Sequence, residues 1–270
     1  PGSIRWIVPR DSWYLDRRNI QPTSRFAASS IGSFAAGIEA SAESATVDEL
    51  FTRLEEAGVL LRLDPAVRPT MYRCATVTRS EVEQLRTLDG VVRAGRVRRI
   101  GTGSIELDGG EIRTTPDTVH VDCTADGLAT RPPVPVFDGD RITLQAVRTC
   151  QQVFSAAFTA HVAHAVDDET EQNRLCAPIP HPDTDLDWLR TTAQQARNSL
   201  TWAECPELQQ WLQGARLDAF SSGDPELAAD PEIVTVALRL AGNLQPAIDN
   251  LERLLATQAA TPTTNDRSTP

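Results

Sequence analysis

Residues 46–63, TVDELFTRLEEAGVLLRL, carry the pattern that decides the fold. Thr46 and Glu49 form a capping box, and the leucines that follow it at four-residue spacing predict a helix that Gly58 ends. Residues 59–63 are then apolar enough for a buried strand. A helix, a glycine and a buried strand are typical of one half of a β-α-β unit.

Outward from this stretch, further elements are expected on both sides. Residues 4–8 and 70–77 are predicted to be strands, and the Ala/Ser-rich residues 30–44 a helix. Thr78 and Glu81 form a second capping box before a short helix. Glycine-containing turns then divide a predicted β-meander into strands at 91–100, 104–108, 111–114 and 118–122.

The second half of the chain changes character after the proline-rich residues 131–135, which are typical of a stiff linker. Gly139 and Asp140 follow Asp138 as a turn before a strand at 141–147. Helical patterns dominate from there on. We predict helices at 153–166, 185–203, 206–217 and 231–256, followed by a disordered tail at 257–270.

Composition excludes several kinds of chemistry. All 26 basic residues are arginine, so the chain has no lysine for a Schiff base or a Walker-type phosphate loop. The net charge is −11, and the acidic excess lies after residue 115. Such a chain is not expected to bind nucleic acid or an anionic membrane, and a phosphate site is expected in the first half.

Cysteine usage indicates a reduced, cytoplasmic location. The five cysteines are odd in number and contain no C-x-x-C motif, which argues against a disulfide scaffold or a zinc ribbon. Cys123 and Cys150 are the pair expected to lie closest. His161 and His164 have a spacing that could share a metal ion, but no third ligand matches, so we expect one to pack and the other to be exposed.

Several stretches, in this order, resemble the FAD/NAD(P)-binding oxidoreductases related to flavin monooxygenases, in particular an actinobacterial branch. The similarity runs from Ile4 to about Leu255. The stretches are residues 5–13 (RWIVPRDSW), 69–74 (PTMYRC), 120–127 (HVDCTADG), 154–157 (FSAA) with 161–162 (HV), and 181–185 (HPDTD).

The resemblance implies an α/β fold: a partial Rossmann-type nucleotide-binding unit with a β-meander, followed by a helical C-terminal region. Residues 1–127 would be the remainder of an NAD(P)-binding domain, 128–177 a return to the FAD-binding domain, and 178–256 a helical region. The family's two G-x-G-x-x-G turns are not in the sequence. The chain is therefore expected to be the C-terminal portion of a flavoprotein whose FAD-binding N-terminal portion is missing.

Arginines at the end of the first strand are the candidate ligands of a nicotinamide cofactor. In a Rossmann-type unit this position lies near the adenosine ribose, where Arg10 would bind a 2′-phosphate and Arg17 or Arg18 would supplement it. NADP is thus favoured, and NAD is possible because Asp11 follows directly. The alternative is a solvated arginine cluster.

Two further sets are implied to contact the cofactors. Thr124, Ala125, Asp126 and Gly127 stand where the family has an Ala-Thr-Gly turn beside the dinucleotide, although an ordinary Asp-Gly turn is equally consistent. Gln151, Phe154 and Ser155 open a helix that would point at the flavin, and Gln151 or Ser155 would cap it. Capping without a ligand is the alternative.

Together these features predict part of an oxidoreductase that passes a hydride from NAD(P)H to FAD and is inactive alone, with no catalytic residue assigned. The alternative is a non-catalytic interaction or structural module derived from such a flavoprotein. The sequence indicates no substrate and no oligomeric state.

Overall fold

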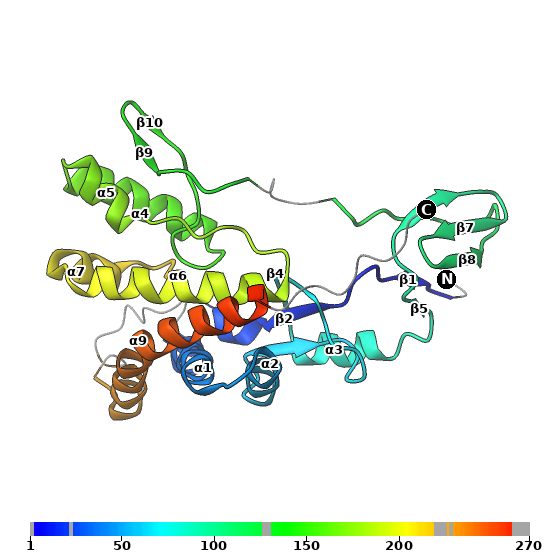
Figure 1. Cartoon of the computed structure of the whole chain (residues 1–270), viewed down its shortest axis with the longest axis horizontal. Helices are drawn as coiled ribbons and strands as arrows, with labels where there is room; N and C mark the ends of the chain where they lie inside the picture. The colour runs from blue at the N-terminus through cyan, green and yellow to red at the C-terminus, as the bar shows by residue number, and fades with distance from the viewer. Residues whose placement is uncertain (1–2, 22–23, 126–130, 219–225, 227–228, 261–270) are drawn as a thin grey trace.

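A computed structural model gives the fold of residues 3–21, 24–125, 131–218, 226 and 229–260. Helices and small sheets make up an elongated molecule (Figure 1). The strands are β1 (Trp6–Ile7), β2 (Ser12–Asp16), β3 (Leu60–Arg62), β4 (Met71–Val77), β5 (Val91–Val92), β6 (Val97–Ile100), β7 (Ser104–Leu107), β8 (Gly110–Arg113), β9 (Phe137–Asp138) and β10 (Arg141–Ile142). The helices are η1 (Arg17–Ile20), α1 (Ser24–Glu43), α2 (Val47–Glu56), α3 (Arg79–Arg86), α4 (Gln152–Ala165), α5 (Glu169–Leu175), α6 (Asp185–Ala203), α7 (Pro206–Gly214) and α9 (Pro231–Ala260).

The stretch that decides the fold forms α2 and β3 as predicted. The hydroxyl of Thr46 accepts a hydrogen bond from the backbone N–H of Glu49, and Gly58 ends the helix at a φ of 69°. β3, however, pairs antiparallel with β2, whereas β4 pairs parallel with it. The expectation that β3 is the parallel strand of a β-α-β unit is therefore wrong: the parallel neighbour of β2 is β4, and β3 lies antiparallel on the opposite edge of β2.

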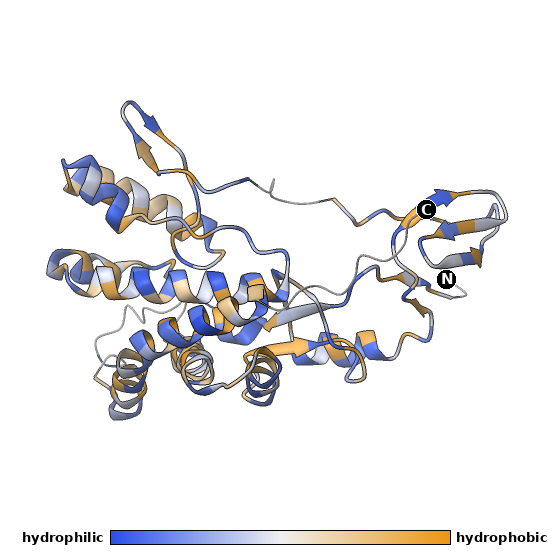
Figure 2. Cartoon of the chain, in the orientation of Figure 1, coloured by the Kyte–Doolittle hydropathy of each residue, from blue (hydrophilic) through white to orange (hydrophobic). Residues whose placement is uncertain are grey.

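A hydrophobic core joins this three-stranded sheet to the helices. Trp13 of β2 stacks on Phe51 of α2, with ring centroids 5.1 Å apart, and Trp188 of α6 meets the edge of the Phe51 ring. Leu251 of α9 is fully buried in the same cluster. Figure 2 shows the alternation of hydrophobic and hydrophilic residues along these helices, which buries one face of each.

The strands β1 and β5 to β8 lie at one end of the molecule, away from the helices α4 to α7 (Figure 1). β1 pairs parallel with β5, and β6, β7 and β8 form an antiparallel meander with turns at the predicted glycines. Residues 118–122 were expected to extend the meander, but they pair with no strand among the described residues. Their side chains are exposed, so the alternation of valines there finds no partner sheet.

The helical C-terminal region confirms the predicted α/β class with helices following the sheets. α6 has the predicted bounds, because Thr184 and Asp187 form a capping box at its start. The predicted strand at 141–147 shortens to β10, which forms a hairpin with β9 through Gly139. α9 continues to Ala260, so residues 257–260 of the expected disordered tail are helical, and residues 261–270 lie outside the described residues.

A disulfide joins Cys74 of β4 to Cys150, with the two Cα atoms 6.4 Å apart. This corrects two expectations: the odd cysteine count did not exclude a disulfide, and the partner of Cys150 is Cys74 rather than Cys123, which is free and exposed.

None of the helices in the described part of the chain combines the length and apolar character needed to cross a bilayer.

Candidate functional site

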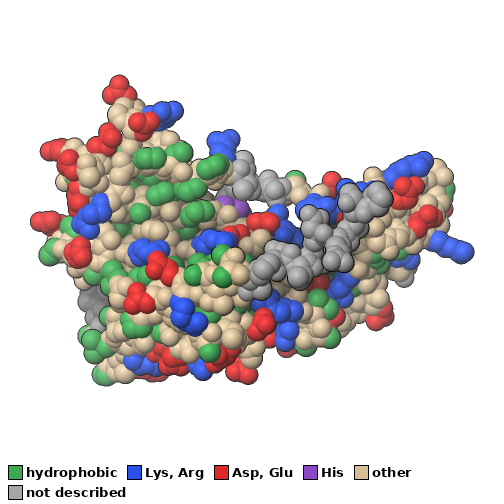
Figure 3. Space-filling view, in the orientation of Figure 1, with side chains coloured by type: hydrophobic (Ala, Val, Ile, Leu, Met, Phe, Trp, Pro, Cys, Tyr) green, Lys and Arg blue, Asp and Glu red, His purple; other side chains and the backbone are tan. Residues whose placement is uncertain are grey.

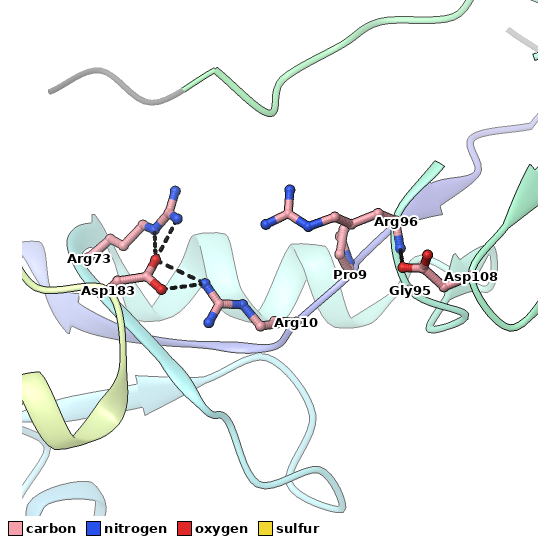
Figure 4. Close-up of a pocket in the computed structure, with 7 residues that line it drawn as sticks. All are labelled: Pro9, Arg10, Arg73, Gly95, Arg96, Asp108 and Asp183. Atoms are coloured by element: carbon pink, nitrogen blue, oxygen red, sulfur yellow. Dashed lines mark hydrogen bonds and ion pairs between the residues drawn. The ribbon is translucent and has the colours of Figure 1, made fainter. Parts of the chain in front are cut away.

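The candidate site is a hollow of about 510 Å³ where five separate segments meet (Figure 4). They are the connection between β1 and β2, the strand β4, the β5–β6 loop, the β7–β8 turn and the segment before α6. Arginine side chains dominate its lining, which consists of Pro9, Arg10, Arg73, Gly95, Arg96, Asp108 and Asp183. The site therefore lies in the arginine-rich first half of the chain, apart from Asp183.

Arg10 and Arg73 meet on one carboxylate. Nη2 of Arg10 lies 2.9 Å from each carboxylate oxygen of Asp183, and Nε of Arg73 lies 2.7 Å from its Oδ1. About a third of each arginine side chain and 39% of the Asp183 side chain are exposed. The three groups thus form a cluster with an excess positive charge that is open to solvent on one side.

The charge state of Asp183 follows from its surroundings. Partial burial by itself raises the pKa of this carboxyl, but the hydrogen bonds from Arg73 and Arg10 outweigh burial and lower the pKa below its ordinary value. Asp183 is therefore ionised at neutral pH. Its carboxylate oxygens accept hydrogen bonds from both guanidinium groups, so Arg10 and Arg73 hold a negative charge at this point.

Arg96 completes the hollow from the opposite side. Figure 4 shows its guanidinium directed toward the space above Arg10, and no side chain among the described residues bonds to it. Its backbone N–H donates to Asp108 Oδ2 over 2.7 Å, and this bond, followed by that from Arg98, lowers the pKa of Asp108. Asp108 is thus already engaged, and it leaves the Arg96 side chain free for an external anion.

Gly95 permits this arrangement. Its φ is 79°, in the left-handed region that favours glycine, and a Cβ atom there would lie 2.5 Å from the Cβ of Asp108. The turn that aims Arg96 at the hollow therefore requires a residue without a side chain.

An ion pair between the buried carboxylate of Asp11 and the partly exposed side chain of Arg93 fixes the connection that carries Arg10. Nε and Nη2 of Arg93 lie 2.8 and 3.1 Å from the two oxygens of Asp11, which is only 8% exposed. The hydrogen bond from Arg93 to Asp11 raises the pKa of Arg93. The backbone carbonyl of Asp11 also accepts from the N–H of Met71 over 3.2 Å, so the connection is tied to both β4 and the β5–β6 loop.

Arg17, the second arginine predicted to bind phosphate, lies elsewhere. It follows the far end of β2, where Nη1 is 3.2 Å from Glu81 Oε1 and Nη2 is 3.2 Å from the carbonyl oxygen of Thr76. Arg18 lines a different, smaller hollow. The structure therefore does not bring Arg17 or Arg18 to Arg10, because β2 separates them along its length.

The predicted dinucleotide turn is only partly described. Thr124 and Ala125 are exposed, and both the N–H and the hydroxyl of Thr124 donate to Asp122 Oδ1, at 2.9 and 2.6 Å. These bonds lower the pKa of Asp122. Asp126 and Gly127 lie outside the described residues.

The predicted flavin-facing set divides into two kinds of residue. Ser155 is buried, donates to the Gln151 carbonyl over 2.7 Å and accepts from the Val147 N–H over 3.0 Å. Phe154 is buried against Trp202 and Arg148. Both residues therefore hold the helix in place.

Gln151 occupies the N-cap position of α4 but forms no side-chain capping bond, so the expectation that Gln151 or Ser155 caps this helix is wrong. The Gln151 Oε1 atom is buried and has no hydrogen-bond partner among the described residues. A buried acceptor without a partner is unfavourable unless a further group supplies the hydrogen bond.

The histidines behave as expected. The His161 ring stacks on Trp211 with centroids 4.7 Å apart, and His164 is exposed. Burial, followed by the charge of His164, lowers the pKa of His161. No group of three potential metal ligands occurs in the described ranges.

The sequence interpretation missed Arg73, Arg96 and Asp183 as site residues. Arg73 and Asp183 belong to stretches that carry the resemblance, and this could have drawn attention to them. Nothing local distinguishes Arg96 from Arg93, Arg98 and Arg99. The turn at Gly95, directly before Arg96, directs this side chain to the hollow, and the effect of the turn can be recognised only in the three-dimensional structure.

Comparison with known proteins gives mycobacterial relatives. The chain is similar to the uncharacterized proteins Rv2000 and MT2056 of Mycobacterium tuberculosis and Mb2023 of Mycobacterium bovis, with 48% identity over 268 residues in each case. The match covers 99% of this chain and 50% of each relative, so the chain spans about half their length. No protein-family model and no solved structure matches the chain.

Proposed function

We propose that the chain is part of an oxidoreductase that uses FAD and a nicotinamide dinucleotide, and that the arginine-lined hollow binds the 2′-phosphate of NADPH. The observation that carries this proposal is the convergence of Arg10, Arg73 and Arg96 on one open hollow. Arg10 is also the residue that the resemblance to flavin monooxygenase relatives assigns to the adenosine ribose.

The chemistry of the three arginines supports a phosphate monoester as the ligand. Guanidinium groups present forked N–H donors that match the oxygens of carboxylates and phosphates. Arg10 and Arg73 already hold an anionic oxygen pair on Asp183, and the Arg96 side chain has no such partner among the described residues. A phosphate group has enough oxygens to bridge Arg96 to the Arg10 side of the hollow.

The start of α4 has two features that fit FAD. The buried Gln151 Oε1 without a partner is an acceptor that a flavin N–H group would satisfy, and the start of α4 favours negative charge on the ring. Phe154 and Ser155 support this helix from within. When bound, FAD would accept a hydride from NADPH. The role proposed for Gln151 is to orient the ring.

The FAD-binding N-terminal portion is proposed to lie in the part of the full-length protein beyond this chain. Relatives about twice as long as the chain have room for it. A cytoplasmic location belongs to the same proposal, because NADPH is a reductant of that compartment.

The experiment that tests the proposal uses the full-length protein that contains this chain, purified without added cofactor. The protein is expected to be yellow and to bleach when NADPH is added without oxygen. A colourless protein that does not take up FAD would contradict the flavoprotein proposal. In that case Gln151 would have no flavin to bind.

A second candidate function is a non-catalytic interaction module. Apolar side chains gather on the surface around α4 (Figure 3), where Val153 is 67% and Leu144 63% exposed. Such a surface is typical of contact with another protein surface. Equilibrium dialysis distinguishes the candidates: affinity for FAD or NADPH tighter than about 100 μM, or about −5.5 kcal/mol, argues for the cofactor-binding function.

A further inference from the structure

The strand β4 is bulged where it carries one of the hollow's arginines. Tyr72 pairs with Trp13 of β2, but the next pair joins Thr76 to Leu15. Residues 73–75 of β4 therefore lie opposite a single residue of β2. Such a bulge re-aims side chains out of the regular alternation, and here it directs Arg73 toward Asp183.

The disulfide is attached to this bulge. Cys74 has a φ of 54°, in the left-handed region that residues with a side chain seldom adopt. At the other end of the bond, Thr149 precedes Cys150 with a φ of 42°, which is more unusual because Thr is β-branched. Backbone of this kind persists where the surrounding structure holds it, and the covalent link is one element that does so here.

The disulfide joins two residues that are not buried, in contrast to the free cysteine Cys176. Cys74 and Cys150 are both partly exposed. By contrast, Cys176 is fully buried, and burial raises the pKa of its thiol to about 12. Thiol–disulfide exchange requires access of an attacking thiolate to one of the two sulfurs, and the partial exposure of both residues favours such access.

We infer that Cys74–Cys150 is a reversible thiol–disulfide site that controls whether Arg73 is held in the anion-binding hollow. This inference rests on the proposed function for the identity of the anion, but not for the movement of Arg73. In a compartment that contains NADPH, a disulfide is more often a redox-sensing device than a permanent cross-link.

The proposed thiol–disulfide exchange conserves atoms and electrons. A low-molecular-weight thiolate attacks one sulfur of the disulfide and forms a mixed disulfide, while the other cysteine leaves as a thiolate and takes up a proton. A second thiol then releases the remaining cysteine as a thiol, and the two small thiols end as one oxidised disulfide. Two electrons pass to the protein, and a small disulfide reverses the reaction.

Reduction is expected to loosen the bulge and to leave Arg10 as the main partner of Asp183. The hollow then keeps Arg10 and Arg96 but loses the fixed position of Arg73. Affinity for a phosphate ligand should fall, because one forked donor is no longer positioned.

The test compares the oxidised chain, the dithiothreitol-reduced chain and the double variant Cys74→Ser/Cys150→Ser. Cys123→Ser is the matched control because Cys123 is free and exposed. Alkylation followed by mass spectrometry should find three of the five cysteines reactive as thiols in the unfolded, oxidised chain and all five after reduction. Phenylglyoxal labelling of Arg73 and amide exchange of β4 then report on the bulge.

Labelling of Arg73 is expected to be at least threefold faster in the reduced chain and in the double variant, with the far-UV circular dichroism unchanged and the Cys123→Ser chain equal to the oxidised wild type. Equal labelling in both redox states would overturn the inference. Loss of the far-UV signal on reduction would also overturn it, since the bond would then be a structural cross-link.

Adenosine 2′,5′-bisphosphate binding separates this inference from the proposed function. Binding that weakens at least threefold on reduction supports both. If Arg73 responds to reduction but the oxidised chain does not bind the bisphosphate, the redox site stands and the proposed phosphate site fails.

Discussion

Arg10 and Asp183, which lie 173 positions apart in the chain, form an ion pair in which one guanidinium nitrogen is 2.9 Å from both carboxylate oxygens. The pair joins the connection after β1 to the segment before α6, and Arg73 completes it from β4. An anion-binding arrangement is therefore assembled from three distant parts of the sequence. Its carboxylate occupies part of the position that an external phosphate would take.

Replacement of Arg96 with Ala is expected to weaken binding of adenosine 2′,5′-bisphosphate about tenfold or more, because a charge-assisted hydrogen bond contributes about 1.5–3 kcal/mol. Isothermal titration calorimetry at low salt measures the loss. Arg141→Ala is the control, since Arg141 forms an ion pair with Asp138 on an exposed hairpin away from the hollow. Equal affinity of the Arg96→Ala and Arg141→Ala variants would exclude Arg96 from the site.

Replacement of Asp183 with Asn is expected to strengthen the same binding several-fold. The amide keeps much of the carboxylate's shape but removes the negative charge that competes for Arg10 and Arg73. Asp138→Asn is the matched control. Weaker binding by the Asp183→Asn variant would indicate that the carboxylate positions the arginines rather than competing with the ligand.

Replacement of Gly95 with Ala is expected to destabilise the chain by about 1–2 kcal/mol, because the left-handed backbone and the contact with Asp108 both disfavour a Cβ. Chemical denaturation measures this change in the free energy of unfolding. At Gly103 an added Cβ meets nothing within 4 Å, so Gly103→Ala should stay within about 0.5 kcal/mol of the wild type. Similar losses in both variants would show that the Gly95 turn has no special requirement.

Acid is expected to destabilise the chain through Asp183 and Asp108. Their pKa values are lower in the folded chain than their ordinary values, so the folded state binds fewer protons than the unfolded state in that range. The resulting stability is complete above pH values of about 4 and is lost as the pH falls through the lowered pKa values.

Denaturation of the wild type and the Asp183→Asn variant at pH 3 to 7 tests the contribution of Asp183. The difference in stability between them should shrink toward acid pH. A difference that is constant with pH would show that the charge of Asp183 does not stabilise the fold.

Local signals in the sequence predicted the helices well. The helical pattern from Asp185 onward gave the bounds of α6, and Thr78 with Glu81 gave the start of α3. These signals act over three or four residues, so they can be recognised without the tertiary structure.

Features that depend on distant pairing could not be predicted in the same way. The direction of β3 depends on how the chain between β2 and β3 returns to the sheet, and residues 118–122 have strand-like alternation without a neighbouring strand in the part of the chain that the structure describes. The Cys74–Cys150 bond spans 76 positions, and cysteine parity contains no information about such a pairing.

In the candidate site, too, features that depend on nearby residues could be predicted and features that depend on distant residues could not. Arg10 could be predicted because the end of a strand can be recognised from nearby residues. Arg17 was predicted from the same kind of signal, yet it follows the far end of β2 and lies away from the hollow. Arg73 reaches the hollow through a bulge, and Arg96 reaches it through the turn at Gly95. Neither device has a sequence pattern specific enough to identify it.

The central claim, that the arginine-lined hollow binds the 2′-phosphate of a nicotinamide dinucleotide, is tested most directly by calorimetry of the oxidised chain with two ligands. Adenosine 2′,5′-bisphosphate and adenosine 5′-monophosphate differ only in the 2′-phosphate. The account predicts that the bisphosphate binds at least tenfold more tightly and that Arg10→Ala abolishes this preference. Equal affinity for the two ligands, or a preference that survives the removal of Arg10, would contradict it.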